Sequence, residues 1–218
     1  IFLLVRLVYF DNKNDQNKRK KTILILNRER FEHDLESIRD DSRIRLLILP
    51  SRVQTALNSL FLEKSKSYSI DKYTEPLPEV DRLINFISDF LRYIDRKYNL
   101  CSILTCSFYY RQDMPYQFAS LKIKVPFHVL FKEYLKDDCQ LEQTIARYKN
   151  NNFKFYGETI FSANQNIQEI LLEAGGCKKS QISIVGSPRF DVIFKKRKID
   201  STSDQKIVTL FSFLHSSG

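Results

Sequence analysis

The sequence predicts an α/β fold in which a parallel sheet is flanked by helices, and three features support this prediction. Short apolar runs of strand length recur along the chain, and longer segments with helical periodicity stand between them. The runs are continuously apolar, which is typical of strands that are buried on both faces. Two of them end at Pro50 and at Gly186, residues that interrupt regular structure. The alternation indicates a β-α-β-α order with right-handed crossovers.

The predicted elements follow one another without a long gap except at residues 63–78, a polar segment with prolines that we expect to be a loop. The strands cover residues 22–26, 44–49, 102–106, 125–131, 159–162 and 182–185, and the helices cover residues 30–38, 53–62, 78–98, 114–121, 140–148 and 165–174. The clearest helix is 78–98, because Pro78 suits a first turn and apolar residues recur from Val80 to Ile94 at spacings of three and four.

The loop after the last predicted strand is the first candidate site. Residues 182–191 read I-S-I-V-G-S-P-R-F-D, and glycine with proline ends the strand in a sharp loop. In an open α/β sheet, ligands bind just beyond the carboxyl ends of the strands. The candidate binding residues here are Gly186, Ser187, Pro188 and Arg189. The alternative is a strand exit without chemistry, in which Arg189 pairs with a carboxylate of its own domain.

Two other strand exits carry side chains that suit a polar ligand. The loop after the third strand contains Tyr109, Tyr110 and Arg111, which can stack on a sugar or form hydrogen bonds to it. The next strand runs into Lys132 and Glu133. Because all these loops leave parallel strands at the same edge of the sheet, we expect them to face one crevice.

Two roles remain open for Ser162 and Asn164, which precede the helix 165–174. Their side chains can cap that helix. The backbone N–H groups exposed at the start of the helix can also bind an anionic ligand. We therefore keep both residues as candidates for substrate binding.

The chain resembles the GT-B glycosyltransferases, in particular the group that builds bacterial capsules and other surface carbohydrates. The resemblance rests on V-G-S-P-R-F-D after a helix and Gly175-Gly176, which is similar to the junction between the two Rossmann-like domains of these enzymes. It also rests on the apolar strand that runs into Lys132 and Glu133, although many relatives carry histidine where this chain has Phe131. The resemblance implies a Rossmann-like domain that forms the N-terminal, acceptor-side half of a GT-B fold.

The activity implied by this resemblance is a metal-independent transfer of a sugar from a nucleotide sugar to a surface polysaccharide or a lipid-linked glycan. An inverting transfer needs a general base at the acceptor hydroxyl and positive groups near the leaving phosphate. Glu133 is the candidate base, and Lys132 and Arg189 are candidate electrostatic partners. The nucleotide sugar enters as a substrate, and we expect neither a cofactor nor a metal, since the chain contains no Asp-x-Asp pair and no P-loop or dinucleotide-binding motif.

Composition and charge agree with this interpretation. The net charge of +9 would attract a phosphate-bearing ligand. We expect no nucleic acid as a partner, because zinc-finger spacing and an RNP-like signature are both missing from the sequence. The four cysteines lack C-x-x-C spacing and are expected to be reduced, which fits a cytoplasmic protein.

We divide the chain into an apolar and basic segment (1–21), the Rossmann-like domain (22–195), and a linker with the first strand of a truncated C-terminal domain (196–218). The missing initiator methionine and the fresh apolar run 207–214 indicate a fragment, and we expect 207–214 to stay outside the sheet. The apolar part of segment 1–21, residues 1–10, is too short to span a bilayer, which takes about twenty residues. Either it lies on the anionic inner face of the cytoplasmic membrane, or it forms a helix packed on the domain followed by a loop.

Other functions remain open. A glycerophosphotransferase or a non-hydrolysing sugar-nucleotide epimerase has the same two-domain form. A basic module that binds membranes or nucleic acid without catalysis belongs to another class. Affinity for anionic liposomes that survives deletion of residues 1–21 would favour such a module.

Overall fold

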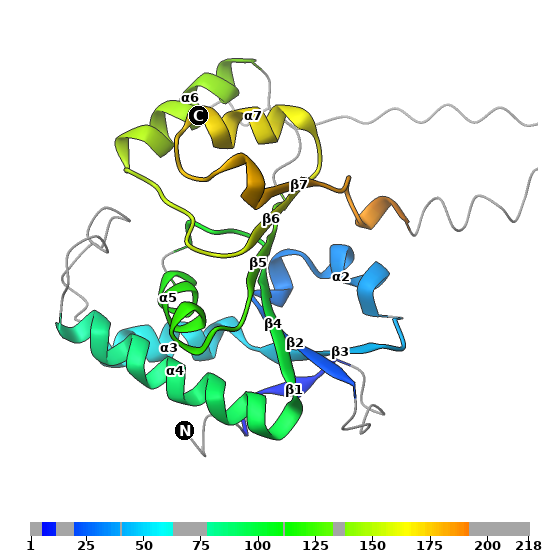
Figure 1. Ribbon diagram of the computed structural model, residues 1–218, viewed down its shortest axis with the longest axis vertical. Coiled ribbons are helices and arrows are strands. Elements are labelled where there is room, and N and C mark those ends of the chain that lie inside the picture. The colour runs from blue at the N-terminus through cyan, green and yellow to red at the C-terminus, as the bar shows by residue number, and fades with distance from the viewer. Residues whose placement is uncertain are drawn as a thin grey trace, which may run out of the picture.

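A seven-stranded sheet organises the computed structural model, which describes residues 6–11, 20–39, 41–62, 78–110, 112–132 and 138–191 (Figure 1). The strand order is β1-β3-β2-β4-β5-β6-β7. β2 to β7 run parallel to their neighbours, and β1 pairs with β3 in the antiparallel sense. Helices flank both faces, so the predicted α/β, Rossmann-like fold is confirmed.

All six predicted strands are present in the sheet, together with one that was not predicted. The bounds are β1 Tyr9–Phe10, β2 Lys21–Leu26, β3 Ile44–Leu49, β4 Leu100–Thr105, β5 Phe127–Leu130, β6 Thr159–Ser162 and β7 Ile182–Ile184. β5 begins two residues later than predicted. Pro126 has no N–H to donate to a neighbouring strand, although its carbonyl still accepts a hydrogen bond from the Ile103 N–H at 2.9 Å.

The helices also follow the prediction closely. Their bounds are α2 Glu32–Arg39, α3 Ser51–Phe61, α4 Pro78–Tyr98, α5 Met114–Ile123, α6 Asp138–Asn150 and α7 Gln165–Glu173, with short 3-10 helices η1 Arg28–Arg30 and η3 Lys179–Gln181. α4 has the predicted bounds, and its apolar stripe is buried. Within the described ranges, no helix is long and apolar enough to cross a membrane.

The two faces of the sheet are covered unequally. α3, α4, α5, α6 and α7 contribute to one large core on the first face, whereas α2 packs Phe31 and Leu35 into a smaller core on the second face (Figure 1). β2 and β4 are neighbours, yet the helices that follow them, α2 and α5, lie on opposite faces. The carboxyl ends of β2 and β4 therefore form the topological switch point, where α/β sheets bind their ligands.

The short strand β1 changes the interpretation of segment 1–21. Tyr9 and Phe10 were expected in a helix or on a membrane surface, but they pair with Ile48 and Leu47 of β3. Asp11 continues this contact by forming ion pairs with Arg28 and Arg39, at 3.0 and 2.6 Å. This part of the segment thus belongs to the sheet. Residues 1–5, 12–19, 63–77 and 192–218, including the run 207–214, lie outside the described residues, so the domain boundaries stay predictions.

Candidate functional site

A buried polar cluster lies at the switch point and links β2, β4 and α5. Asn27 follows β2 and donates its Nδ2 to both carboxylate oxygens of Asp113, at 2.7 and 2.8 Å. Thr105, the last residue of β4, donates its hydroxyl to Asp113 Oδ2 at 2.7 Å. All three side chains are fully buried. The cluster therefore links the carboxyl ends of β2 and β4 to the start of α5 through hydrogen bonds. Its side chains are not exposed to solvent.

One residue of this cluster, Asn27, has an unusual backbone conformation that the hydrogen bonds of the cluster stabilise. Asn27 lies in the left-handed region, with φ of 54° and ψ of 39°. Asparagine tolerates this conformation better than most residues. Gln112 donates its Nε2 to Asn27 Oδ1 at 3.2 Å, so the amide is held on both sides. The chain is thereby turned from β2 into η1.

Asp113 is the titratable group of the cluster. Burial raises the pKa of its carboxyl to about 7, and the hydrogen bonds from Thr105 and Asn27 limit the rise because they stabilise the ionised form. Asp113 is also the N-cap residue of α5, but its side chain makes no capping bond and turns to Asn27 instead. Its position suits a role in holding the site together.

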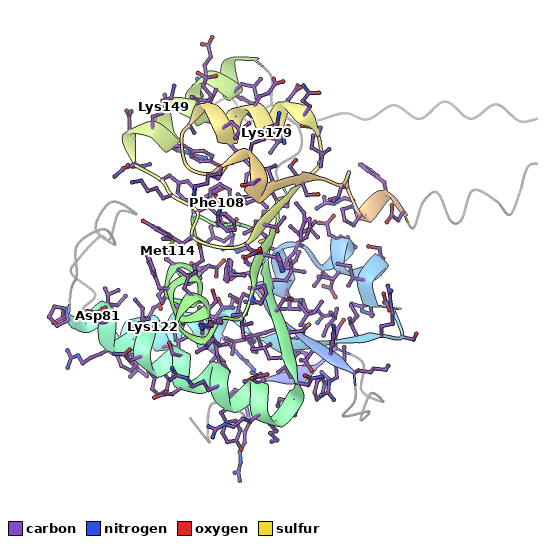
Figure 2. The ribbon with its side chains drawn as sticks, in the orientation of Figure 1. Asp81, Phe108, Met114, Lys122, Lys149 and Lys179 are labelled. Carbon is purple, nitrogen blue, oxygen red and sulfur yellow. The ribbon has the colours of Figure 1, made fainter. Side chains whose placement is uncertain are left out.

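The loop between β4 and α5 is anchored by Phe108. Its fully buried ring lies 4.2 Å from the ring of Phe153 and 5.4 Å from that of Phe131, measured between centroids. Figure 2 shows Phe108 between α5 and the pair α6 and α7. Gln117 holds the Phe108 carbonyl with a hydrogen bond of 2.8 Å. This anchoring positions the two tyrosines that follow.

Tyr109 and Tyr110, which were predicted to bind substrate, lie next to each other, and an arginine side chain lies over each of the two rings. Their ring centroids are 5.3 Å apart. The guanidinium carbon of Arg30 lies 4.6 Å from the Tyr110 ring centroid, and that of Arg147 lies 5.7 Å from the Tyr109 centroid. Among the described residues, no carboxylate lies within ion-pair distance of either arginine. Within this part of the chain, each guanidinium group therefore lies beside an aromatic ring and forms no ion pair.

Lys132 belongs to the same group of charges. Burial raises the pKa of the Cys106 thiol to about 12, the charge of Asp113 raises it too, and the charges of Lys132 and Arg30 lower it. Cys106 directly follows β4, so the charges of Lys132, Arg30 and Asp113 all act at the carboxyl end of that strand. Glu133 and Arg111 lie outside the described residues, and their predicted roles stay predictions.

The exits of β6 and β7 form a second group of candidates. Asn164 Oδ1 accepts a hydrogen bond from the Ile167 N–H at 3.0 Å, so this residue caps α7 as the capping alternative proposed. The buried hydroxyl of Ser162 donates to the Asn164 carbonyl at 3.2 Å, and the Ser162 carbonyl accepts from the Val185 N–H at 2.9 Å. The two exits are therefore adjacent, although Ser162 and Asn164 are engaged in local structure.

The sharp loop after β7 is also present. Gly186 has a φ of 78°, a conformation that favours glycine, and Pro188 begins a final turn in which the Asp191 N–H bonds to its carbonyl. The Ser187 hydroxyl is buried and has no hydrogen-bond partner among the described residues. Figure 1 shows this turn on the same side of the sheet as α2.

Arg189 does not extend freely from this loop. Its Nε and Nη2 donate to the two carboxylate oxygens of Asp34 on α2, at 3.0 and 2.6 Å. The Asp34 side chain is fully buried, whereas 36% of the Arg189 side chain is exposed. The geometry is that of the alternative in which Arg189 pairs with a carboxylate of its own domain. Arg189 is therefore bound to α2 and is not among the proposed ligand contacts.

Sequence reasoning did not select Asn27, Arg30, Asp113 or Arg147 as site residues, although Asp113 belongs to the polar exit loop predicted after the third strand. Two of them had a local signal: Asn27 stands directly after a strand, and Asp113 directly precedes Met114-Pro115, which is a pattern of helix starts. The two arginines had none, because their partners Tyr110 and Tyr109 are distant in the sequence.

Comparisons with known proteins add one structural similarity. No protein-family model and no curated protein matches the chain. Among solved structures, the chain is similar to the UDP-GlcNAc 2-epimerase of Neisseria meningitidis bound to UDP-GlcNAc, with a TM-score of 0.43 and 12% identity. The alignment covers 83% of this chain and 50% of that one, so the chain spans about half the length of that structure. Similarity of this degree does not decide the function, which we infer below from the residues of the site.

Proposed function

We propose that the chain is the acceptor-side domain of a GT-B-type glycosyltransferase, which moves a sugar from a nucleotide-sugar donor to a surface polysaccharide or lipid-linked glycan. The observation that supports this proposal is the group formed by Arg30, Lys132 and Tyr110 at the carboxyl end of β4, beside the switch point. Guanidinium and ammonium groups bind phosphate, and an aromatic ring can pack against a sugar.

The proposed roles follow from charge and burial. Lys132 and Arg30 would stabilise the negative charge that develops on the leaving phosphate, which a cation does best when it is held in place beforehand. Asp113 is fully buried and would position the β4–α5 loop without contacting substrate. Glu133, which follows Lys132 in the sequence, remains the proposed general base. We also retain metal independence, a cytoplasmic location and membrane contact through the residues of segment 1–21 outside β1 and Asp11 as parts of the proposal.

Turnover by the product of the complete gene tests this function. We would assay a panel of nucleotide sugars and CDP-glycerol, with and without a chelator, and follow both transfer and epimerisation. Arg30→Ala should lower kcat/KM for transfer by about tenfold or more, which corresponds to about 1.4 kcal/mol of transition-state stabilisation. Arg92→Ala is the matched control, because Arg92 lies exposed on α4 and pairs with Asp89.

Four results would contradict the proposal. Strict dependence on a divalent metal would refute the mechanism. Epimerisation of UDP-GlcNAc without transfer would identify the epimerase alternative, and turnover of CDP-glycerol alone would identify a glycerophosphotransferase. Equal activity of Arg30→Ala and Arg92→Ala would remove Arg30 from the site.

A further inference from the structure

α6 carries a polar cavity that the sequence analysis did not single out. Its volume is about 280 Å³, and it is lined by Gln140, Gln143, Thr144 and Arg147. These positions are spaced by three and four residues, so they lie on one face of the helix. Thr144 is buried, whereas the other three side chains are exposed. The helix therefore presents a continuous polar surface with a defined floor.

The lining has a distinctive chemistry. The two glutamine carboxamides both donate and accept hydrogen bonds, as does the Thr144 hydroxyl, while the Arg147 guanidinium only donates. None of the lining residues that the structure describes is a carboxylate. Such a set matches a ligand with several hydroxyl groups and one negative group, because the hydroxyls can exchange hydrogen bonds with the amides and the anion can pair with the guanidinium.

The cavity is connected to the candidate site through Arg147. The guanidinium of Arg147 lies over Tyr109 and, at 5.3 Å from the ring centroid, over Tyr148. Tyr109 in turn packs against Tyr110, which carries Arg30. Arg30 of η1 and Arg147 of α6 thus each lie over one ring of the tyrosine pair in the β4–α5 loop. A chain of sugar residues that occupies the first position would reach the second across the tyrosine pair.

We propose that the α6 cavity is a subsite for an anionic sugar residue, such as a uronate or a sugar phosphate, in the acceptor glycan. Gln140, Gln143 and Thr144 would bind its hydroxyl groups, and Arg147 its carboxylate or phosphate. The identification of this sugar as part of the acceptor rests on the proposed function. The binding of an anionic sugar to α6 does not.

An NMR titration of the 218-residue chain tests the subsite, with glucuronate, glucose 6-phosphate, glucose and inorganic phosphate as probes. We expect glucuronate, glucose 6-phosphate or both to shift the side-chain amide signals of Gln140 and Gln143. Glucose and inorganic phosphate should each need at least about tenfold higher concentration to produce the same shifts. Glucose lacks the anionic group, and phosphate lacks the sugar hydroxyls. Comparison of the two anionic sugars distinguishes a carboxylate from a phosphate.

Variants on the same helix complete the test. Arg147→Gln should weaken binding of the anionic sugar by about tenfold or more. Lys149→Gln is the matched control, because Lys149 is a cation of α6 that pairs with Glu173 and is not part of the cavity lining. If Arg147→Gln does not retain the wild-type spectrum, Gln143→Ala, with an expected loss of about threefold or more, takes its place.

The subsite is overturned if glucose or inorganic phosphate binds as tightly as the anionic sugars, or if Arg147→Gln binds like Lys149→Gln. A parallel titration with UDP-GlcNAc separates this result from the proposed function. If Arg30→Ala weakens UDP-GlcNAc binding while α6 responds to no anionic sugar, the subsite is wrong and the proposed function stands. If α6 binds an anionic sugar while no nucleotide sugar binds near Arg30, the subsite stands and the proposed function fails.

Discussion

Asp113 combines full burial with direct hydrogen bonds from two side chains, and both influences act on its titration. Burial disfavours the carboxylate, whereas Asn27 and Thr105 stabilise it, and the first influence is larger, so that the pKa lies at about 7. The carboxyl therefore changes its charge close to neutral pH while it holds the β2 and β4 exits together.

Asp113→Asn should change how stability depends on pH. The folded-state pKa of about 7 lies above the ordinary value of 3.8, so the unfolded chain releases this proton first as the pH rises. The stability that Asp113 contributes is therefore fully present below about pH 4 and is lost as the pH rises to about 7, by at most about 4 kcal/mol. Urea unfolding across this range should show wild-type protein losing free energy of unfolding relative to Asp113→Asn.

Asp89→Asn is the control for this prediction, because Asp89 lies exposed on α4 and pairs with Arg92. Its unfolding free energy should follow that of the wild type across the same range. Parallel curves for wild type and Asp113→Asn would mean that the carboxyl does not titrate between about pH 4 and about pH 7 in the folded protein.

The sequence indicated the role of a single residue only where its interaction partner lies a few positions away. Capping by Asn164 could be proposed as one of two alternatives because its partner Ile167 is three residues away. Asn27 and Asp113 are separated by 86 positions, and no motif links them. Their pairing depends on β2 and β4 being neighbours in the sheet, which the order of elements alone does not establish.

At the scale of elements, the same difference between local and distant interactions recurs. The bounds of α4 were predicted correctly because its apolar residues are regularly spaced. An amphipathic helix of this kind can pack on any flat apolar surface, so its prediction does not require knowledge of a specific partner. β1 was missed because a strand of two residues has no usable periodicity and exists through its pairing with β3. The first helix was predicted to begin at residue 30, but the left-handed Asn27 first leads the chain into η1.

The pair Arg189–Asp34 joins the loop after β7 to α2, and its loss should destabilise the protein. Arg189→Ala would leave the fully buried Asp34 carboxylate without this cation. Because Arg189 is partly exposed, we expect a loss of about 1–3 kcal/mol, below the range for fully buried pairs. Chemical denaturation of Arg189→Ala, Asp34→Asn and the double variant should reveal coupling between the two residues.

Arg92→Ala is the matched control for the pair, since both Arg92 and Asp89 are more than half exposed. An exposed pair of this kind contributes less than about 1 kcal/mol. If Arg189→Ala is no more destabilised than Arg92→Ala and yet lowers transfer, then Arg189 acts on the ligand as the sequence suggested.

At the scale of the whole molecule, the fold was predictable and the arrangement of the site was predictable in part. Alternating runs and helices indicated a parallel sheet, and parallel strands bring Tyr110 and Lys132 to the same edge. The sequence did not indicate that Arg30 and Arg147 meet Tyr110 and Tyr109, because these contacts depend on how η1 and α6 pack. Nor did it indicate the cavity of about 360 Å³ at the opposite edge, beside Leu121 and Tyr156.

The most direct test of the central claim is to map where each nucleotide sugar of the assay panel perturbs the NMR spectrum of the chain. We predict shifts at the carboxyl edge, in the Arg30 side chain and in the backbone of Cys106 and Tyr110, and we predict that Arg30→Ala weakens them while Arg92→Ala does not. Shifts confined to the cavity at the amino ends of β5 and β6, near Tyr156, and unchanged by Arg30→Ala, would contradict the claim.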